Sequence, residues 1–209
     1  MLPRPTLSIS DTDLIARART GDDRAFAILV ERYEGAVAAT VIGMLGRGDD
    51  ADDVGQETFI RFHRALGSFR GESSLKTYLV HIAMNLSLNA LKRRRRSLLR
   101  FVSRDDKSDS GNSGDEIVKL AEPRVGPDGD IDASELREFV RAAVARLGEK
   151  HRAVVVLRMF HDYSTRETAE MLGLPEGTVL SRLSRAMKEL EAQLRPYVSA
   201  GATLPEVSR

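Results

Sequence analysis

The chain has 209 residues, of which 42% are hydrophobic, 5% aromatic and 30% charged. This length suits one or two domains, and the few aromatic residues together with abundant Leu, Ala, Arg and Glu favour an all-α fold. The absence of cysteine excludes disulfides, thiolate metal sites and cysteine nucleophiles. The four histidines include no His-x-x-x-His pair, so we expect no histidine-based metal site, and nothing indicates another cofactor.

The net charge of the chain is +1, but the charged residues are distributed unevenly along it. Residues 1–104 carry a net +5 and residues 136–209 a net +3, whereas residues 105–135 between them carry a net −7. The acidic stretch is rich in Ser, Gly, Asp and Pro, and it has too few large apolar residues to offset the entropy lost on ordering. The sequence therefore predicts two small basic domains joined by a flexible acidic linker.

The N-terminus lacks the apolar run of a signal peptide, and no apolar stretch reaches the ~20 residues of a membrane span. We therefore expect a soluble, cytoplasmic protein without membrane insertion. The expected divisions are a disordered N-terminus over residues 1–10, an N-terminal helix bundle over 11–97, the linker over 98–133, a four-helix C-terminal domain over 134–196 and a tail over 197–209.

Apolar residues recur at helical spacing throughout the N-terminal domain. Ser10 or Asp11 can cap the first helix, and a later helix begins near Ser73 or Ser74. That later helix is expected to end in five consecutive basic residues at 92–96. Adjacent cations repel unless anions are near, so the run favours phosphate contacts, although it can also be a solvated helix end. A helix over about residues 50–66 is expected to pack inward through Val54, Phe59, Phe62 and Leu66.

The C-terminal domain carries a helix-turn-helix pattern. Helices are predicted over residues 135–148 and 150–161, and Ser164-x-x-Glu167 is a capping box that opens a short third helix. Gly173 suits a sharp turn and Pro175 the start of a fourth helix. That fourth helix presents an apolar inner face at Val179, Leu183, Met187, Leu190 and Leu194. A short helix, a glycine turn and a helix with a basic outer face indicate DNA binding, although such a basic stripe can also be ordinary solvated surface.

Three sequence stretches, in this order, resemble the bacterial sigma factors of the extracytoplasmic-function group. They are DADDVGQETFIR (residues 50–61), FRGESSLKTYLVHIAMN (69–85), and a longer stretch from LGEKHR (147–152) to GLPEGTVLSRLSRA (173–186). The first resembles the polymerase-binding region 2.2, the second the promoter-melting segment, and the third region four. The resemblance implies three partners: RNA polymerase core (the β′ clamp helices and the β flap), promoter DNA and an anti-sigma factor. It also implies no catalytic activity.

Acidic residues cluster at the start of the helix near residue 50. A carboxylate cluster can be a solvated helix start, stabilised by the helix dipole, or a metal or acid–base site. The resemblance instead implies a surface for the polymerase β′ clamp helices. It comprises Asp52, Asp53, Gln56, Glu57, Phe59, Ile60 and Arg61.

The loop and helix after residue 69 are, by the resemblance, the segment that captures the minus-ten promoter element. Such capture needs polar groups around an unstacked base, a stacking partner and cations for the backbone. Tyr78 stands where the family usually has Trp, and it can alternatively be ordinary core packing; His81 stands where the family often has Arg. The implied residues are Arg70, Glu72, Ser73, Ser74, Lys76, Thr77, Tyr78, His81, Asn85, Asn89, Lys92, Arg93 and Arg94.

The recognition helix near the C-terminus is, by the same resemblance, the reader of the minus-thirty-five element. Leu180 stands where the family commonly has a basic residue, and Ser184 where it often has His or an aromatic residue, which implies an unusual preference. The implied residues are Thr165, Arg166, Thr178, Ser181, Arg182, Ser184, Arg185 and Lys188.

Other functions stay open from the sequence. A conventional helix-turn-helix regulator would bind duplex DNA as a dimer, but it leaves the stretch at 69–89 without a role. A non-catalytic module that binds acidic proteins is a second alternative. An enzyme is a third, and it depends on the aspartate cluster alone.

Overall fold

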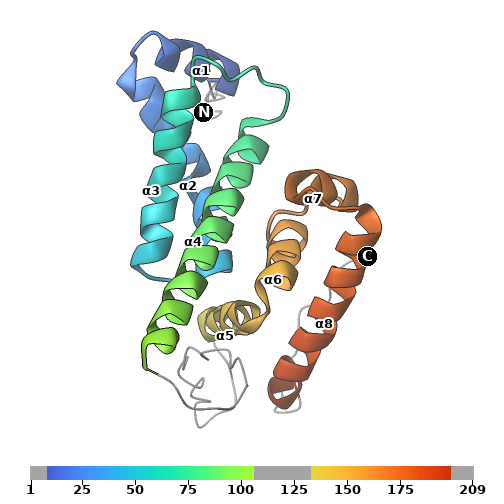
Figure 1. Ribbon diagram of the computed structural model, residues 1–209. Coiled ribbons are helices and arrows are strands. Elements are labelled where there is room, and N and C mark those ends of the chain that lie inside the picture. Colours follow the sequence, from blue (N-terminus) through green and yellow to red (C-terminus); the bar gives the residue numbers. More distant parts are fainter. Residues whose placement is uncertain (1–8, 106–132, 199–209) are drawn as a thin grey trace. The chain divides into compact units, whose positions relative to one another are not determined.

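Figure 1 shows the computed structural model, which describes residues 9–105 and 133–198. Every regular element of the described residues is a helix, so the predicted all-α fold with two helical domains is confirmed. The described residues form two compact units. One contains residues 9–42 and 47–87, and the other contains residues 43–46, 88–105 and 133–198. No helix in these ranges is long and apolar enough to cross a membrane.

The N-terminal part begins with four helices, α1 (Asp11–Arg19), α2 (Asp23–Leu45), α3 (Asp49–Ala65) and α4 (Leu75–Asp105). Capping side chains start α1, α2 and α4, whereas α3 follows Gly48 without a side-chain cap. The Ser10 hydroxyl accepts a hydrogen bond from the Asp13 N–H, Asp22 accepts from the Ala25 N–H, and the Ser74 hydroxyl accepts from the Thr77 N–H. Of the alternatives left by the sequence, the structure uses Ser10 and Ser74.

The expected end of α4 at the basic run is wrong, because the helix continues through it to Asp105. Helical geometry spreads five consecutive side chains around the helix, so their charges separate and the helix need not stop there. Residues 106–132 of the expected linker lie outside the described residues, as do residues 1–8 and 199–209 of the expected termini.

The inner face of α3 differs from the expectation at one position. Phe62 is fully buried and stacks on Phe26 of α2 with the ring centroids 5.9 Å apart, but Phe59 is only partly buried. Thr58 is fully buried in its place, four residues from both Val54 and Phe62. Its hydroxyl donates to the Val54 carbonyl at 2.8 Å, so this polar side chain is buried without an unpaired donor.

The C-terminal part contains α5 (Ala133–Arg146), α6 (Glu149–Val155), the π-helical turn η1 (Val156–Phe160), α7 (Thr165–Leu172) and α8 (Glu176–Val198). The single helix expected over 150–161 is therefore an α-helix that widens into a π-turn. One buried cluster joins α5, α6 and α8, and a second joins α6, α7 and α8. Together they hold α7 and the start of α8 on a common support.

The helix-turn-helix forms as its sequence predicts. Ser164 and Glu167 make the reciprocal capping box, and Gly173 turns the chain with a φ of 62°. The inner face of α8 is corrected at Met187, which is 45% exposed, while Ala186 is fully buried. Ala186 is seven residues after the buried Val179, so its side chain points within about 20° of the same direction. Met187 is eight residues after Val179, so its side chain is rotated by about 80° from the buried face.

Candidate nucleic-acid and protein interfaces

The residues expected on α3 form a mixed surface of acidic and apolar side chains along one face. Asp52, Asp53, Gln56, Ile60 and Arg61 are exposed, in two rows with four-residue spacing, while Phe59 and Glu57 are partly buried beside them. Ile60 is 44% exposed among these charges. A large apolar side chain within a charged rim is typical of a protein-binding surface.

Glu57 is held in its ionised form. Arg61 Nε donates to Glu57 Oε1 at 2.8 Å, and this hydrogen bond holds the pKa of the Glu57 carboxyl below its ordinary value. Within residues 9–105 and 133–198, no group of three or more His, Asp or Glu side chains is arranged to hold a metal ion.

The loop before α4 presents short polar side chains to solvent. Arg70, Glu72, Ser73 and Ser74 are all exposed, and Gly71 turns the backbone with a φ of 72°. The Ser74 hydroxyl also lies 2.9 Å from the hydroxyl of Thr77, in addition to capping α4. Ser74 thus combines a structural contact with a place in the expected binding loop.

Tyr78 lies between the interior and this loop. It is partly buried, with its ring 4.9 Å from the Phe69 ring and 6.2 Å from the Phe62 ring. The ring contacts agree with core packing of Tyr78, and its partial burial leaves some of the side chain exposed. Edge and tilted contacts of this kind hold an aromatic ring in a fixed orientation.

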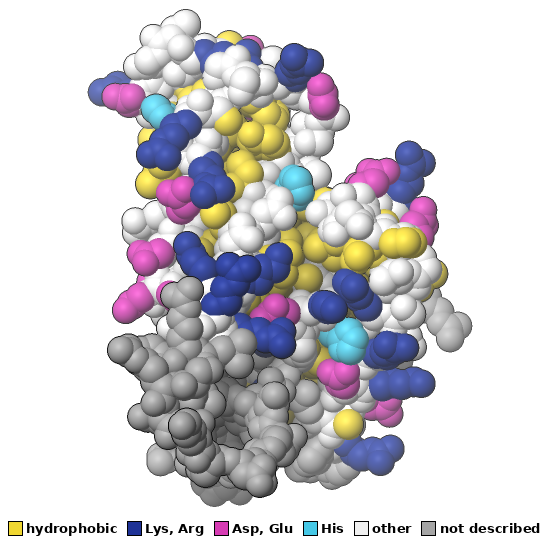
Figure 2. Space-filling view, in the orientation of Figure 1, with side chains coloured by type: hydrophobic (Ala, Val, Ile, Leu, Met, Phe, Trp, Pro, Cys, Tyr) yellow, Lys and Arg dark blue, Asp and Glu magenta, His cyan; other side chains and the backbone are white. Residues whose placement is uncertain are grey.

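A polar and cationic stripe, hereafter the α4 stripe, continues along the outer face of the helix. Its exposed members His81, Asn85, Asn89 and Lys92 follow one another at spacings of three and four residues. Lys76 is also exposed, in the first turn of α4, but lies outside this row. Asn85 Nδ2 lies 3.0 Å from His81 Nε2. The exposed Arg93 and Arg94 follow directly, and Figure 2 shows Lys and Arg side chains gathered along this helix.

The residues expected on α8 form a second cationic stripe, hereafter the α8 stripe. Thr178, Ser181, Arg185 and Lys188 follow one another at three- and four-residue spacing, and the last three are exposed. Ser184 is exposed beside them, whereas Arg182 is partly buried, so the two arginines differ in accessibility. The exposed Leu180 and Met187 lie on the neighbouring row, with Leu180 54% exposed.

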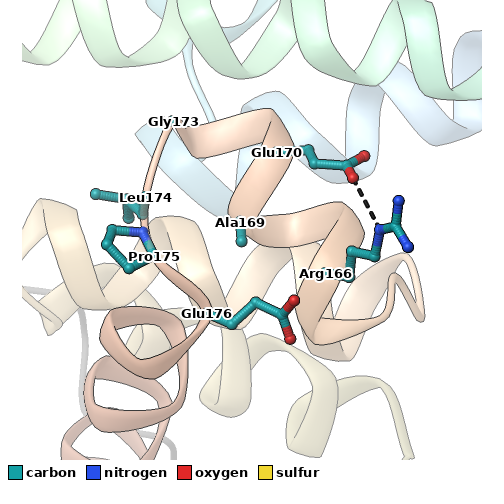
Figure 3. Close-up of a pocket in the computed structure, with 7 residues that line it drawn as sticks. All are labelled: Arg166, Ala169, Glu170, Gly173, Leu174, Pro175 and Glu176. Carbon is teal, nitrogen blue, oxygen red and sulfur yellow. Dashed lines mark hydrogen bonds and ion pairs between the residues drawn. The ribbon is translucent and has the colours of Figure 1, made fainter.

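A shallow hollow lies at the turn between α7 and α8 (Figure 3). The exposed Arg166 lies at its rim and donates to Glu170 Oε1 at 3.0 Å, while Glu176 also lines the hollow. These two carboxylates raise the pKa of the Arg166 guanidinium, first through the Glu170 hydrogen bond. They also weaken the positive potential near Arg166, which sequence reasoning alone did not anticipate. Thr165, the first residue of α7, is partly buried.

One long-range contact to the loop was missed from the sequence. Arg19, at the end of α1, donates from Nε to the Leu66 carbonyl at 2.8 Å and from Nη2 to the Phe69 carbonyl. No local pattern marks this residue, because its partners lie 47 and 50 positions away.

Family models and known proteins match both parts of the chain. The model described as Sigma-70 region 2 matches residues 29–97, and that described as Sigma-70, region 4 matches residues 138–190. The RNA polymerase sigma-H factor of Pseudomonas aeruginosa is 34% identical over 90% of this chain and 95% of its own length. The ECF RNA polymerase sigma-E factor of Escherichia coli K12 is 33% identical, over 91% of this chain and 97% of its own length.

Two solved structures are similar as well. CnrH, solved in complex with the cytosolic domain of CnrY, aligns with a TM-score of 0.57 at 26% identity, covering 89% of this chain and 97% of CnrH. The sigma factor RpoE of Bartonella quintana, solved with the anti-sigma factor NepR, aligns with a TM-score of 0.57 at 22% identity, covering 81% of this chain and 96% of RpoE. The second similarity is one of fold.

Proposed function

Because the chain belongs to the sigma-70 family of RNA polymerase sigma factors, in its extracytoplasmic-function (ECF) group, we propose that it binds polymerase through one surface and recognises the promoter through two others. As a sigma factor it binds RNA polymerase core and promoter DNA and directs promoter-specific initiation. The observation that carries the proposal is that one chain presents a polar, cationic stripe on α4, preceded by a polar loop, and a second cationic stripe on the recognition helix α8.

The α3 surface binds the β′ clamp helices of the polymerase. Its exposed carboxylates attract a basic partner, and Ile60 supplies apolar area that is buried on association. The C-terminal domain binds the β flap, so that the polymerase holds both parts of the chain on the promoter.

The loop at residues 70–74 and the α4 stripe capture the minus-ten element as a single strand. Extruding a base costs a few kcal/mol, and stacking on an aromatic ring restores about 1–3 kcal/mol per base. Tyr78 supplies the ring, the loop hydroxyls and Glu72 contact the edge of the extruded base, and the cations of α4 contact phosphates. Melting is thus driven by preferential binding to the unpaired strand.

The N-terminal half of α8 enters the major groove at the minus-thirty-five element. The exposed Arg185 reaches base edges or phosphates, and Arg182 contributes from its partly buried position. Arginine forms paired hydrogen bonds with guanine O6 and N7, and such a contact discriminates against a wrong base by about 1–3 kcal/mol. Arg166 contributes from α7, with its charge moderated by Glu170 and Glu176.

We further propose that the protein catalyses no reaction of its own and acts in the cytoplasm, where polymerase and promoter DNA meet. A partner of the anti-sigma type would control it by covering these surfaces. The similarity to CnrH, which was solved with the cytosolic domain of a second protein, supports such control.

Runoff transcription with purified polymerase core on a promoter library tests the proposal. The expected result is initiation from a small set of promoters that share two elements, with no transcript when this chain is omitted. Failure to copurify with core, combined with dimeric binding to a palindromic site, would instead support a conventional helix-turn-helix regulator.

A further inference from the structure

A contact from α1 reaches the proposed minus-ten site from outside the part of the chain that the region 2 model matches. Arg19 precedes the range 29–97 matched by the region 2 model. Its guanidinium nevertheless donates to two carbonyls, those of Leu66 and Phe69, on the chain that leads from α3 into the loop. One side chain therefore spans the three-residue step at which this segment changes direction.

The carbonyls of Leu66 and Phe69 accept hydrogen bonds from a distant side chain, Arg19. Leu66 is the C-cap of α3, where carbonyls have no partner within the helix. The N–H groups of Ser68 and Phe69 both donate back to the Ala65 carbonyl, at 3.0 and 2.9 Å. A guanidinium is planar and presents its donors in a rigid fork, so it fixes the two carbonyls relative to each other.

Phe69 is consequently held at two points. Arg19 donates a hydrogen bond to the Phe69 carbonyl. The Phe69 ring lies 4.9 Å from the Tyr78 ring and 6.1 Å from the Phe62 ring. The next residue, Arg70, is the first of the exposed binding loop, and Gly71 follows in the left-handed region. At the far end the loop is fixed by the Ser74 cap. The exposed residues thus lie between two anchors, of which Arg19 is the one supplied from a separate helix.

We propose that Arg19 is a positioning residue for the minus-ten site, and that the base preference of this site depends on the Arg19 contacts with Leu66 and Phe69. This inference rests on the proposed function of the loop in capturing an unpaired base. Arg19 touches no base itself. It sets the place from which Arg70 and Glu72 reach the base and the orientation of the Phe69 ring against Tyr78.

The test uses two variants and a matched control. Arg19→Ala removes both hydrogen bonds, and Arg19→Lys keeps the charge but replaces the fork with a single ammonium group. Arg17→Ala is the control, because it removes from the same helix an exposed arginine that is hydrogen-bonded to Asp22 at 2.7 Å. Each variant is assembled with polymerase core into holoenzyme.

The readout is the affinity of each holoenzyme for single-stranded, non-template minus-ten oligonucleotides in which every base is replaced in turn by the other three. The affinity ratio between the preferred and the replaced base measures selectivity. We expect Arg19→Ala to lower this ratio by about two- to thirtyfold at the captured base, and Arg19→Lys to lower it less. Arg17→Ala should keep the wild-type ratios, and core affinity and binding to a minus-thirty-five duplex should stay unchanged in all three.

Unchanged ratios in both Arg19 variants would overturn the inference while leaving the proposed function of the loop intact. A lower melting temperature without a change in the ratios would also overturn it, since Arg19 would then only stabilise the fold. If the wild-type holoenzyme itself shows no base preference on these oligonucleotides, the proposed capture by the loop is wrong, and the inference falls with it.

Discussion

The start of α7 and the turn after this helix are formed by motifs of residues close in the sequence, whereas the loop before α4 is held by contacts from several helices. Ser164 and Glu167, three residues apart, cap the start of α7, and Gly173 supplies the left-handed step at the turn after this helix. At the loop, contacts come from Arg19 on α1, Phe62 on α3 and Tyr78 on α4. The surface proposed for duplex DNA therefore depends on short local motifs, while the loop proposed to capture an unpaired base depends on several helices.

The largest expected effect is on the affinity for polymerase core, and it should come from Asp53→Arg on α3. This substitution lies outside both proposed DNA-binding surfaces. Reversing an exposed charge at a protein interface should weaken the affinity for core by several-fold to hundreds-fold. Stability should change by no more than about 0.5 kcal/mol, because the side chain is exposed. Core affinity is measured by titration and stability by denaturant unfolding. Asp23→Arg, an exposed first-turn carboxylate of α2, is the control, and an equal effect in both variants would contradict the assignment.

The next largest effect should be confined to the locally built surface. Arg182→Ala and Arg185→Ala should impair use of the minus-thirty-five element more than melting, and the more exposed Arg185 should matter more. A lost guanine contact costs about 1–3 kcal/mol and relaxes sequence preference, whereas a lost phosphate contact flattens the salt dependence by ~1. Transcription is measured on promoters with intact and scrambled elements.

Arg137→Ala, an exposed arginine of α5, is the control for these recognition-helix variants. If both recognition-helix variants transcribe like wild type on the intact promoter, α8 does not read the element as proposed. If they fail equally on a premelted template, their defect lies in folding or core binding.

The same contrast explains how far the sequence could predict the structure. The capping box, the glycine turn and the caps at Ser10 and Ser74 depend on neighbours within a few residues, and all of them formed. Long-range contacts such as Arg19 to Phe69 leave no local pattern, because any arginine at a helix end satisfies the helix dipole equally well. The inner faces were predicted except where a small or polar residue, Ala186 or Thr58, took the buried position of a larger apolar one. The size and polarity of Ala186 and Thr58 alone could not identify them as buried residues.

Matched cap variants in the two regions give a smaller effect. Ser164→Ala and Ser74→Ala each remove an N-cap hydroxyl, which should cost about 1 kcal/mol of stability in the part of the chain that contains it. Only Ser74→Ala should also change base preference at the minus-ten element, because Ser74 lies within the proposed binding loop. Thermal unfolding gives the stability, and oligonucleotide binding gives the preference. A change of minus-ten preference in Ser164→Ala would contradict the separation of the two surfaces.

The smallest expected effect is a change with salt in the pKa of a carboxyl group. It is tested by comparing Glu57 on α3 with Glu167 on α7. The Arg61 hydrogen bond lowers the pKa of Glu57, whereas hydrogen bonds from the Ser164 side chain and backbone N–H lower the pKa of Glu167. Because both values lie below the ordinary 4.5 of glutamate, each group stabilises the fold above that pH, and the contribution is lost as the pH falls through the folded pKa.

Salt should distinguish the two groups, because mobile ions screen the attraction of an exposed ion pair more than a hydrogen bond to a neutral hydroxyl and amide. Raising the salt concentration should therefore move the pKa of Glu57 back toward 4.5 and leave that of Glu167 nearly unchanged. Carboxyl resonances followed by NMR through a pH titration at low and high salt measure both values in one sample. Arg61→Gln should raise the pKa of Glu57 at low salt and reduce its salt dependence to the smaller part that comes from Arg64. Equal salt responses of Glu57 and Glu167 would mean that distant charges, and not the hydrogen bonds of the capping box, hold the Glu167 carboxylate in its ionised form.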